Sequence, residues 1–287
     1  MDHTSNCRTT GRNFCASADG HKIAALFVDV DGTILRCQPY FDQATADFGY
    51  FMKIRGFDPD ESIRVLREVD KENAEAAGFE RDRFGNSLVQ AYDKIRLSKR
   101  RRFRDEDVEH DHRICQNIGR APFFREPELF TNAAPTLGRA WHNFMVFAVT
   151  IGNREAQKYK IRQAGLNPVF DEILITSRDD KPTLVSQVIK DLNIDPKMSA
   201  FIGNSQRSDG ACLAVTNFIY LPLEPGWAFD NQSVLPTDTG FEVFRVDDWR
   251  QAEERAINSL VRRRRQVIGA QKPKPSKAPC GDCSKEG

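Results

Sequence analysis

The chain has 287 residues, a formal net charge of +1 and 29% charged residues. This length allows a sizeable buried core and suggests one large domain with an insertion, or two domains. The near-zero net charge excludes a global field that would draw the protein to nucleic acid or to a membrane surface. The seven cysteines lack the number and spacing of a disulfide framework. Without an apolar leader or a run of ~18 apolar residues, we expect a soluble, cytoplasmic protein.

The first ordered element is expected after a polar stretch. Residues 1–20 are small and polar without periodicity, so we expect them to be disordered, like the Pro/Lys-rich tail 268–287. Residues 23–28 then form an unbroken apolar run, which is typical of a strand buried on both faces of a parallel sheet. This run ends in Asp29-Val30-Asp31-Gly32-Thr33.

A long insertion with helical periodicity follows, over residues 37–121. Its clearest helix start is Asp58-Pro59-Asp60-Glu61, which supplies an N-cap, a first-turn proline and a capping-box carboxylate. We expect an all-helical module beside the sheet. Apolar residues at helical spacing predict four helices, carried by Phe41–Phe51, Ile63–Val69, Phe84–Ile95 and Val108–Ile118.

Strands and helices alternate in the rest of the chain. This alternation predicts a doubly wound, parallel α/β sheet of the Rossmann-like type, formed by residues 21–36 and 122–267. We expect residues 34–40 to be a loop, and the helical stretch 126–141 to be split at Pro135. Further strands are expected at 144–150, 172–176, 200–203, 218–221 and 241–246, and helices at 154–164, 181–192 and 249–260.

Polar residues follow four of the expected strands, and the carboxyl ends of parallel strands meet at one edge of a sheet. Two close carboxylates repel each other unless a cation or a proton lies between them. Carboxylate and carbonyl oxygens suit a hard divalent ion, a lysine balances phosphate charge, and a hydroxyl donates to a phosphate oxygen. The pattern therefore favours phosphoryl transfer. The residues are Asp29 and Asp31, then Thr150, then Lys181, then Asn204 and Asp209.

Each of these residues also has an ordinary structural explanation when it is taken alone. Asp-Gly turns commonly end strands, Thr150 could be a satisfied strand-end hydroxyl, and Lys181 a solvated lysine at a helix start. Their shared placement, one polar group after each buried strand, favours a common site.

The same segments resemble the four motifs of the haloacid dehalogenase-like superfamily of hydrolases. The first motif, a strand followed by Asp-x-Asp-Gly-Thr, matches Asp29–Thr33, and the second matches Thr150. The third matches Lys181, and the fourth matches Gly203-Asn204 with the later Asp209. The resemblance covers roughly 21–36 and 122–247. It implies that the helical module, residues 37–121, is a cap inserted between the first two motifs.

The resemblance implies an Mg²⁺-dependent phosphatase that acts on a small phosphorylated metabolite. In such an enzyme Asp29 is the nucleophile that forms an aspartyl-phosphate, and Asp31 protonates the leaving group and then activates water. Asp31, in place of an aromatic residue, resembles the phosphatase branch and not the dehalogenases. The implied metal set is Asp29, Asp31, Asn204 and Asp209, with the Val30 carbonyl, and the implied substrate-binding set is Gly32, Thr33, Ile151, Gly152 and Asn153.

One position departs from the family pattern. Asn204 stands where many members have an acidic metal ligand, and an amide oxygen brings less charge to Mg²⁺. Two alternatives stay open: a phosphotransferase or mutase whose cap excludes water, and a weakly catalytic binding or regulatory protein, which Asn204 and the two tails motivate. The basic run Lys99–Arg104 does not favour nucleic acid, because the acidic run Asp105–Asp107 follows it and favours self-pairing.

Overall fold

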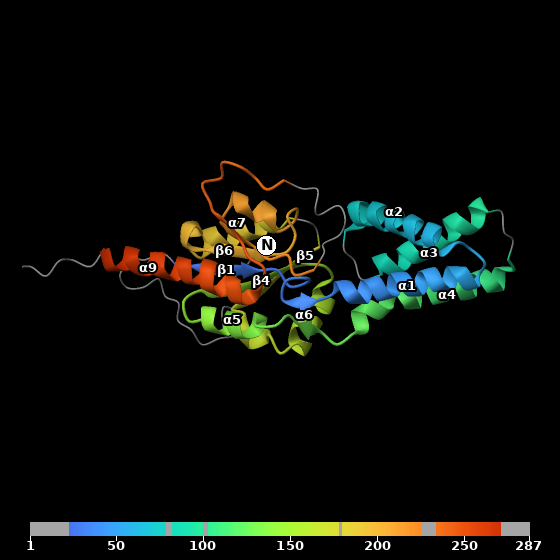
Figure 1. The fold of residues 1–287 in the computed structure, drawn as a ribbon, viewed down its shortest axis with the longest axis horizontal. Coiled ribbons are helices and arrows are strands. Elements are labelled where there is room, and N and C mark those ends of the chain that lie inside the picture. Colours follow the sequence, from blue (N-terminus) through green and yellow to red (C-terminus); the bar gives the residue numbers. More distant parts are fainter. Residues whose placement is uncertain (1–22, 79–81, 100–102, 178–179, 225–233, 271–287) are drawn as a thin grey trace, which may run out of the picture.

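The computed structural model describes residues 23–78, 82–99, 103–177, 180–224 and 234–270. A sheet with helices on both faces forms one lobe, and a group of long helices forms a second lobe beside it (Figure 1). The expected disordered segment 1–20 lies outside the described residues, as do residues 271–287 of the expected tail, whereas residues 268–270 belong to the last helix. Among the described residues, no helix combines the length and apolar character that a membrane span requires.

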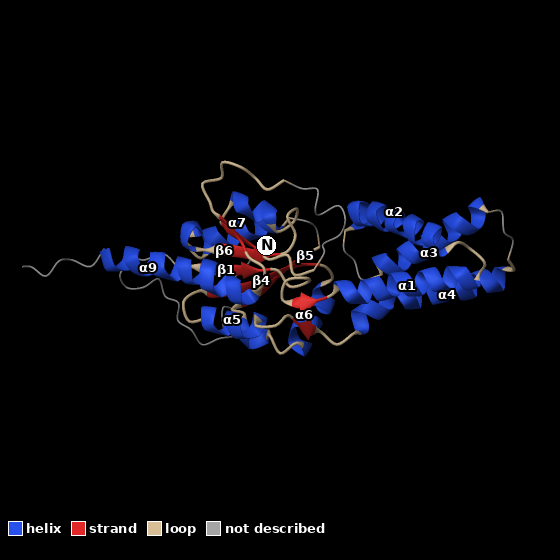
Figure 2. Ribbon diagram, viewed as in Figure 1, coloured by secondary structure: helices blue, strands red, loops and turns tan. Residues whose placement is uncertain are grey.

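Six parallel strands form the main sheet, in the order β5-β4-β1-β6-β7-β8. Figure 2 shows the strands of the sheet in red, with helices around them. The central strand β1 pairs with β4 on one side and β6 on the other, and all four of its residues are buried. The predicted doubly wound sheet is therefore confirmed. The strands are β1 (Ala25–Val28), β4 (Met145–Ile151), β5 (Glu172–Thr176), β6 (Ala200–Gly203), β7 (Asn217–Tyr220) and β8 (Val243–Arg245).

The two faces of the sheet bury alternate residues of β1. Leu26 and Val28 belong to a core that includes side chains of the helices on one face, whereas Ala25 and Phe27 belong to the core on the other. This alternation explains why β1 is apolar without interruption. The first face carries α5 (Ala133–Ala140), α6 (Arg154–Gln163), α8 (Trp249–Gln251), a π-helix (Ala252–Ile257) and α9 (Asn258–Ala270); the second carries α7 (Lys181–Asp191) and a 3₁₀ turn (Gly210–Ala214).

Four helices form the second lobe, the helical module, around an apolar cluster of their own. The second helix begins where the capping box predicted, because the Asp58 carboxylate accepts a hydrogen bond from the Glu61 amide at 2.7 Å. Inside the module the buried Asp111 carboxylate accepts from the Tyr92 hydroxyl at 2.6 Å and pairs with Arg55. The helices are α1 (Gln38–Ile54), α2 (Pro59–Ala77), α3 (Arg83–Ser98) and α4 (Asp105–Arg120).

The ends of the expected basic run pair with nearby acids. Lys99 contacts Glu61 at 2.9 Å, and Arg104 contacts Glu106 at 2.8 Å and Asp107 at 3.0 Å. Residues 100–102 of the run lie outside the described residues. Arg104 therefore pairs with the acidic run as expected, whereas Lys99 pairs instead with Glu61 in another helix of the same lobe.

Two segments differ from the sequence-based expectations. The expected loop 34–40 contains the short strand β2 (Leu35–Arg36) and the start of α1, and β2 pairs antiparallel with β3 (Glu128–Leu129). The stretch 126–141 is not a helix split by proline. The helix α5 begins at Ala133, so Pro135 lies in its first turn, where no amide donor is needed.

The crossing of α3 and α4 depends on two glycines that face each other. A Cβ atom on Gly119 would lie 2.7 Å from the Gly85 nitrogen and closer still to its Cα. We therefore expect Gly119→Ala to destabilise the protein by about 1–3 kcal/mol, because two backbones must move apart. Gly138→Ala in α5 is the matched control, since a Cβ there meets nothing within 4 Å. It should stabilise by about 0.5–1 kcal/mol. Urea unfolding measures both, and equal effects would contradict the packing argument.

Candidate functional site

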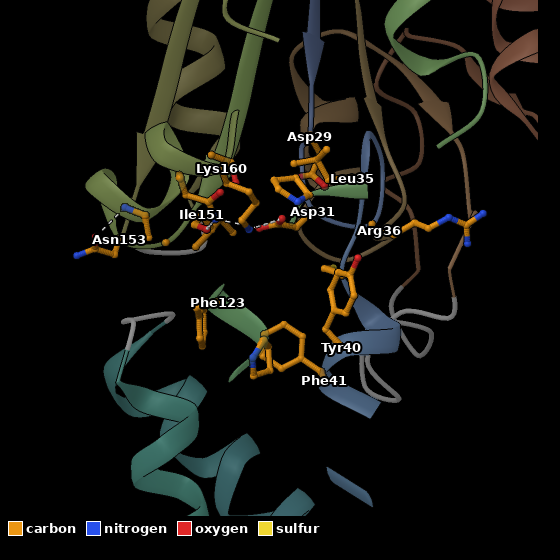
Figure 3. Close-up of a pocket in the computed structure, with 18 of the residues that line it drawn as sticks. Asp29, Asp31, Leu35, Arg36, Tyr40, Phe41, Phe123, Ile151, Asn153 and Lys160 are labelled. Atoms are coloured by element: carbon orange, nitrogen blue, oxygen red, sulfur yellow. Dashed lines mark hydrogen bonds and ion pairs between the residues drawn. The ribbon is translucent and has the colours of Figure 1, made fainter. Parts of the chain in front are cut away.

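A cavity of about 700 Å³ lies between the sheet lobe and the helical module, at the carboxyl ends of β1, β4 and β6. Strand-end residues face residues of α1 and the 3₁₀ turn η1 (Ala121–Phe124) across it (Figure 3). The topology thus brings together segments that are far apart in the sequence. Of the predicted residues, Asp29, Asp31, Gly32, Thr150, Ile151, Gly152, Asn153, Lys181, Asn204 and Asp209 line the cavity.

A buried lysine joins two carboxylates at the end of β1. The Lys181 ammonium lies 2.6 Å from an oxygen of Asp29 and 2.6 Å from an oxygen of Asp209. All three side chains are almost fully buried. Two carboxylates and one ammonium leave one excess negative charge. Burial and the charge of Asp209 raise the pKa of Asp29 to about 7, although Lys181 acts to lower this pKa. The site therefore favours a further cation.

A threonine hydroxyl connects Asp29 to Asn204. The Thr33 hydroxyl lies 3.0 Å from Asp29 Oδ2 and 3.1 Å from Asn204 Oδ1, so its single proton is shared between two acceptors. Gly32 has a φ of +79°, and a Cβ atom there would lie 2.5 Å from Asn204 Nδ2. Only glycine fits this turn without displacing Asn204.

Asp209 is held by the loop that follows β6. Its Oδ2 accepts a hydrogen bond from the Ser205 amide at 2.9 Å. A Cβ on Gly203 would overlap with the Asp209 carboxylate, which explains the glycine at the end of β6. The spacing of Gly203, Asn204 and Asp209 in the sequence therefore reflects one compact loop.

Asp31 is held separately, by the helix α6. Lys160 Nζ donates to Asp31 Oδ1 at 2.6 Å, and Gln157 Nε2 donates to Asp31 Oδ2 at 2.9 Å. Burial raises the pKa of Asp31, but the charge and hydrogen bond of Lys160 and the hydrogen bond of Gln157 outweigh it and lower that pKa below its usual value. A metal ion at Asp31, as expected from the resemblance, would therefore have to compete with these two donors for the carboxylate oxygens. The sequence reasoning missed Lys160 and Gln157; their only signal is the helical i, i+3 spacing.

The expected substrate-binding residues after β4 are partly engaged in holding the backbone. The Gly152 amide donates to the Thr176 carbonyl at 2.9 Å. The Asn153 side chain caps α6, because its oxygen accepts from the Ala156 amide at 3.1 Å. Thr150 is buried at the cavity wall. Gly152 and Asn153 therefore shape the cavity. The Gly152 amide proton and the Asn153 side-chain oxygen, however, already have hydrogen-bond partners within the protein.

Thr33 differs from its expected role, since it is fully buried and does not line the cavity. Its hydroxyl faces Asp29, and its carbonyl accepts a hydrogen bond from Trp249 Nε1 at 2.9 Å. Trp249, at the start of α8, is also fully buried. The first motif is thereby anchored from the C-terminal part of the chain, a role of Trp249 that the sequence pattern did not reveal.

We expect Trp249→Phe to destabilise the protein by about 1–3 kcal/mol, because the smaller phenyl ring cannot donate to the buried Thr33 carbonyl and leaves part of the buried indole space empty. Denaturant unfolding measures the change. Any activity of the protein should fall as well, since Thr33 orients Asp29. Wild-type stability in the variant would mean that this hydrogen bond contributes little.

The residues around Asp29 fit a hard divalent ion. No group of three or more His, Cys, Asp or Glu side chains in the described part of the chain forms a ready metal cage. The available donors are instead two carboxylates and an amide, those of Asp29, Asp209 and Asn204, which Thr33 and Lys181 tie together. Mg²⁺ suits a site that offers few protein oxygen ligands, because water and substrate oxygens complete its coordination shell. These three residues would hold it.

Solved structures share the fold. A haloacid dehalogenase-like family hydrolase from Xanthomonas campestris has a TM-score of 0.66 and 22% identity, over 87% of this chain and 96% of that one. The putative hydrolase YfnB from Bacillus subtilis, solved with magnesium, has a TM-score of 0.52 and 17% identity, over 80% and 97%. An L-2-haloacid dehalogenase from Xanthobacter autotrophicus has a TM-score of 0.51 and 15% identity, over 84% and 98%. The fold alone therefore does not choose between activities.

A search of curated proteins finds no match. The family model for haloacid dehalogenase-like hydrolases, however, matches residues 23–214, which is more than half of the chain. This range includes the first motif at Asp29, the helical module, and the loop that carries Asp209. The chain therefore belongs to the haloacid dehalogenase-like hydrolase family.

Proposed function

We propose that the protein is a cytoplasmic, Mg²⁺-dependent phosphatase that hydrolyses a small phosphorylated metabolite through an aspartyl-phosphate. The observation that carries the proposal is the pair of differently held carboxylates in one turn. Asp29 is fixed by Lys181 and Thr33, whereas Asp31 is fixed by Lys160 and Gln157. Two carboxylates in distinct environments suit a nucleophile and an acid/base.

In this proposal Asp29 attacks phosphorus, because its carboxylate lies at the cavity wall directly after the central strand. The Thr33 hydroxyl fixes one Asp29 oxygen. Lys181 stabilises the ionised form of Asp29 and offers positive charge to the phosphate oxygens. The Thr150 hydroxyl, at the end of β4, donates to another phosphate oxygen.

Asp31 transfers the protons. In the free protein its lowered pKa keeps it ionised, and an ionised carboxylate is ready to deprotonate the water that hydrolyses the aspartyl-phosphate. Lys160, at 2.6 Å, stabilises that charge. The protonated form that assists departure of the leaving group is less stable beside Lys160, so leaving groups that need little protonation are favoured.

Mg²⁺, when bound, would neutralise charge shared by the carboxylates and the phosphate. Asp29, Asn204 and Asp209 would hold it, and Asp31 is reserved for proton transfer. The helical module, residues 37–121, acts as the cap that covers the cavity and limits entry of water.

Phosphate release from p-nitrophenyl phosphate, with Mg²⁺ and with EDTA, tests the proposal. We expect Mg²⁺-dependent release and an acid-stable but hydroxylamine-sensitive phosphoprotein in quenched reactions. Parallel assays measure chloride release from 2-chloropropionate and transfer of phosphate to added alcohols. Chloride release without phosphate release would indicate a dehalogenase, and phosphorylated alcohol as the main product a phosphotransferase. Binding of phosphate without turnover would indicate a regulatory protein.

We expect Asn204→Asp to bind Mg²⁺ more tightly in the free state, by about tenfold, because a carboxylate replaces a neutral amide in the metal set. Turnover should fall if the added charge repels phosphate. Calorimetric Mg²⁺ titration measures the affinity, and Asn193→Asp, at an exposed position outside the cavity, is the matched control. Equal Mg²⁺ affinity in wild type and Asn204→Asp would remove Asn204 from the metal set.

A further inference from the structure

The cavity has an aromatic side opposite the carboxylates. Tyr40 and Phe41 lie in the first turn of α1, and Phe123 lies in η1. Figure 3 shows these three rings across the cavity from Asp29 and Asp31. We refer to Tyr40, Phe41 and Phe123 as the aromatic wall.

Building on the proposed function, we propose that the substrate is a phosphate monoester with a bulky aromatic leaving group that packs against the aromatic wall. The phosphate would lie at Asp29, and the leaving group would extend past Asp31 toward the helical module. The wall is then a specificity-determining surface of the site.

The rings of the aromatic wall are held by one another and by residues outside the cavity lining. The Phe41 ring packs edge-on against Phe123, with centroids 5.6 Å apart, and against Phe84 at 5.3 Å. Phe84 belongs to the buried core of the helical module. The Tyr40 hydroxyl donates to the Glu126 carbonyl at 3.2 Å. Rings fixed in this way lose little entropy when a ligand packs on them.

The size of the cavity favours a large leaving group. A volume of about 700 Å³ falls within the range of pockets that bury drug-sized ligands. A phosphate ester with two or three carbons would fill a small part of this space and would leave the aromatic wall wet. Burial of apolar surface is the main source of affinity that such a wall offers.

The helix terminus beside the wall, which would best attract a second anion, is already filled. The N-terminus of α1, which would otherwise attract an anion, is already occupied by the buried carboxylate of Glu224. Its Oε2 accepts from the Cys37 amide at 3.2 Å and the Gln38 amide at 3.0 Å. Further basic residues line the cavity as well. Arg36 and Arg83 pair with Glu128 and Asp70, and Arg125, Lys158 and Arg162 are exposed, where an ion pair with substrate is weak. Arg207 is half-buried.

A matched pair of substrates isolates the aromatic contact. 3-Phenylpropyl phosphate and n-propyl phosphate release alcohols of nearly equal acidity, so the chemical step is the same and only the ring differs. We expect kcat/KM to favour the phenyl ester by about tenfold or more in the wild type, in the range of apolar pocket discrimination. Phe123→Ala should reduce this ratio by about tenfold. Phe123→Leu, which keeps more of the volume, should reduce it less.

Tyr50→Ala is the matched control, because Tyr50 lies on α1 with 67% of its surface exposed and does not line the cavity. The ratio of kcat/KM for the two esters should be the same in Tyr50→Ala as in the wild type. Binding of 3-phenylpropylphosphonate and n-propylphosphonate, measured by calorimetry, gives the same comparison without turnover. If neither these esters nor p-nitrophenyl phosphate is hydrolysed but the phenyl phosphonate binds more tightly, the phosphatase proposal fails and the aromatic wall stands. Equal ratios for wild type and Phe123→Ala in both assays would overturn the inference.

Discussion

Replacing Asp29 with asparagine is expected to abolish phosphate release, by ~10⁴-fold or more, while the fold stays intact. The amide keeps the volume of the carboxylate and removes the nucleophilic charge. It also relieves the repulsion with Asp209, which contributes to the raised pKa of Asp29. The stability of the apoprotein should therefore be maintained or increased.

Phosphate release and urea unfolding of purified Asp29→Asn measure the two effects separately. Asp191→Asn, at the exposed end of α7, is the control and should retain activity and stability. Near wild-type turnover in Asp29→Asn would exclude an aspartyl-phosphate at this position.

The second large effect is expected for Lys181→Met. Lys181 is 2% exposed and lies 2.6 Å from both Asp29 and Asp209. Methionine fills the space but leaves two buried carboxylates without their cation. Loss of one partner of a buried ion pair typically costs about 3–5 kcal/mol. We expect a loss of this size at pH 8 in the absence of metal, measured by urea unfolding.

The loss should depend on pH in a defined direction. Burial raises the pKa of Asp29 in the folded protein to about 7, above the ordinary value of 3.8, even with Lys181 present. Ionisation of Asp29 therefore destabilises the fold progressively as pH rises from about 4 to 7, and without Lys181 this effect grows. The deficit of Lys181→Met should shrink toward pH 4. Lys190→Met, at an exposed position of α7, should show no such trend. A deficit that is constant with pH would contradict the charge argument.

The sequence predicted the elements whose pattern reflects burial. The strand β1 was recognisable because both of its faces are covered, and α2 because Asp58 and Glu61 form its cap. The convergence of Asp29, Lys181 and Asp209 followed from the parallel sheet, which brings strand ends to one edge. Each of these features has a signal in the local sequence, and the fold then brings the residues concerned close together.

Other features have no local signal. The strands β2 and β3 contain two residues each, too few for any periodicity, and they exist because Leu35 and Leu129 pair across the module's connections. In the sequence, Lys160 and Gln157 look like ordinary exposed helix residues. Their contacts with Asp31 are visible only in the structure, where α6 lies beside it. The position of Phe123 likewise depends on the path of the chain from the last helix of the module back to the sheet. Such contacts depend on tertiary placement, which one sequence does not determine locally.

The order of the strands has a consequence for how the chain folds. The amide of Ala25 in β1 donates to the Ser199 hydroxyl, 174 residues later, and Trp249 reaches back 216 residues to Thr33. The helical module, whose contacts are local, is complete before these partners emerge from the ribosome, and local contacts form fastest. The apolar strand β1 therefore waits unpaired while the module folds. Newly made chains are expected to need protection of residues 23–28 against aggregation until β4 and β6 close around them.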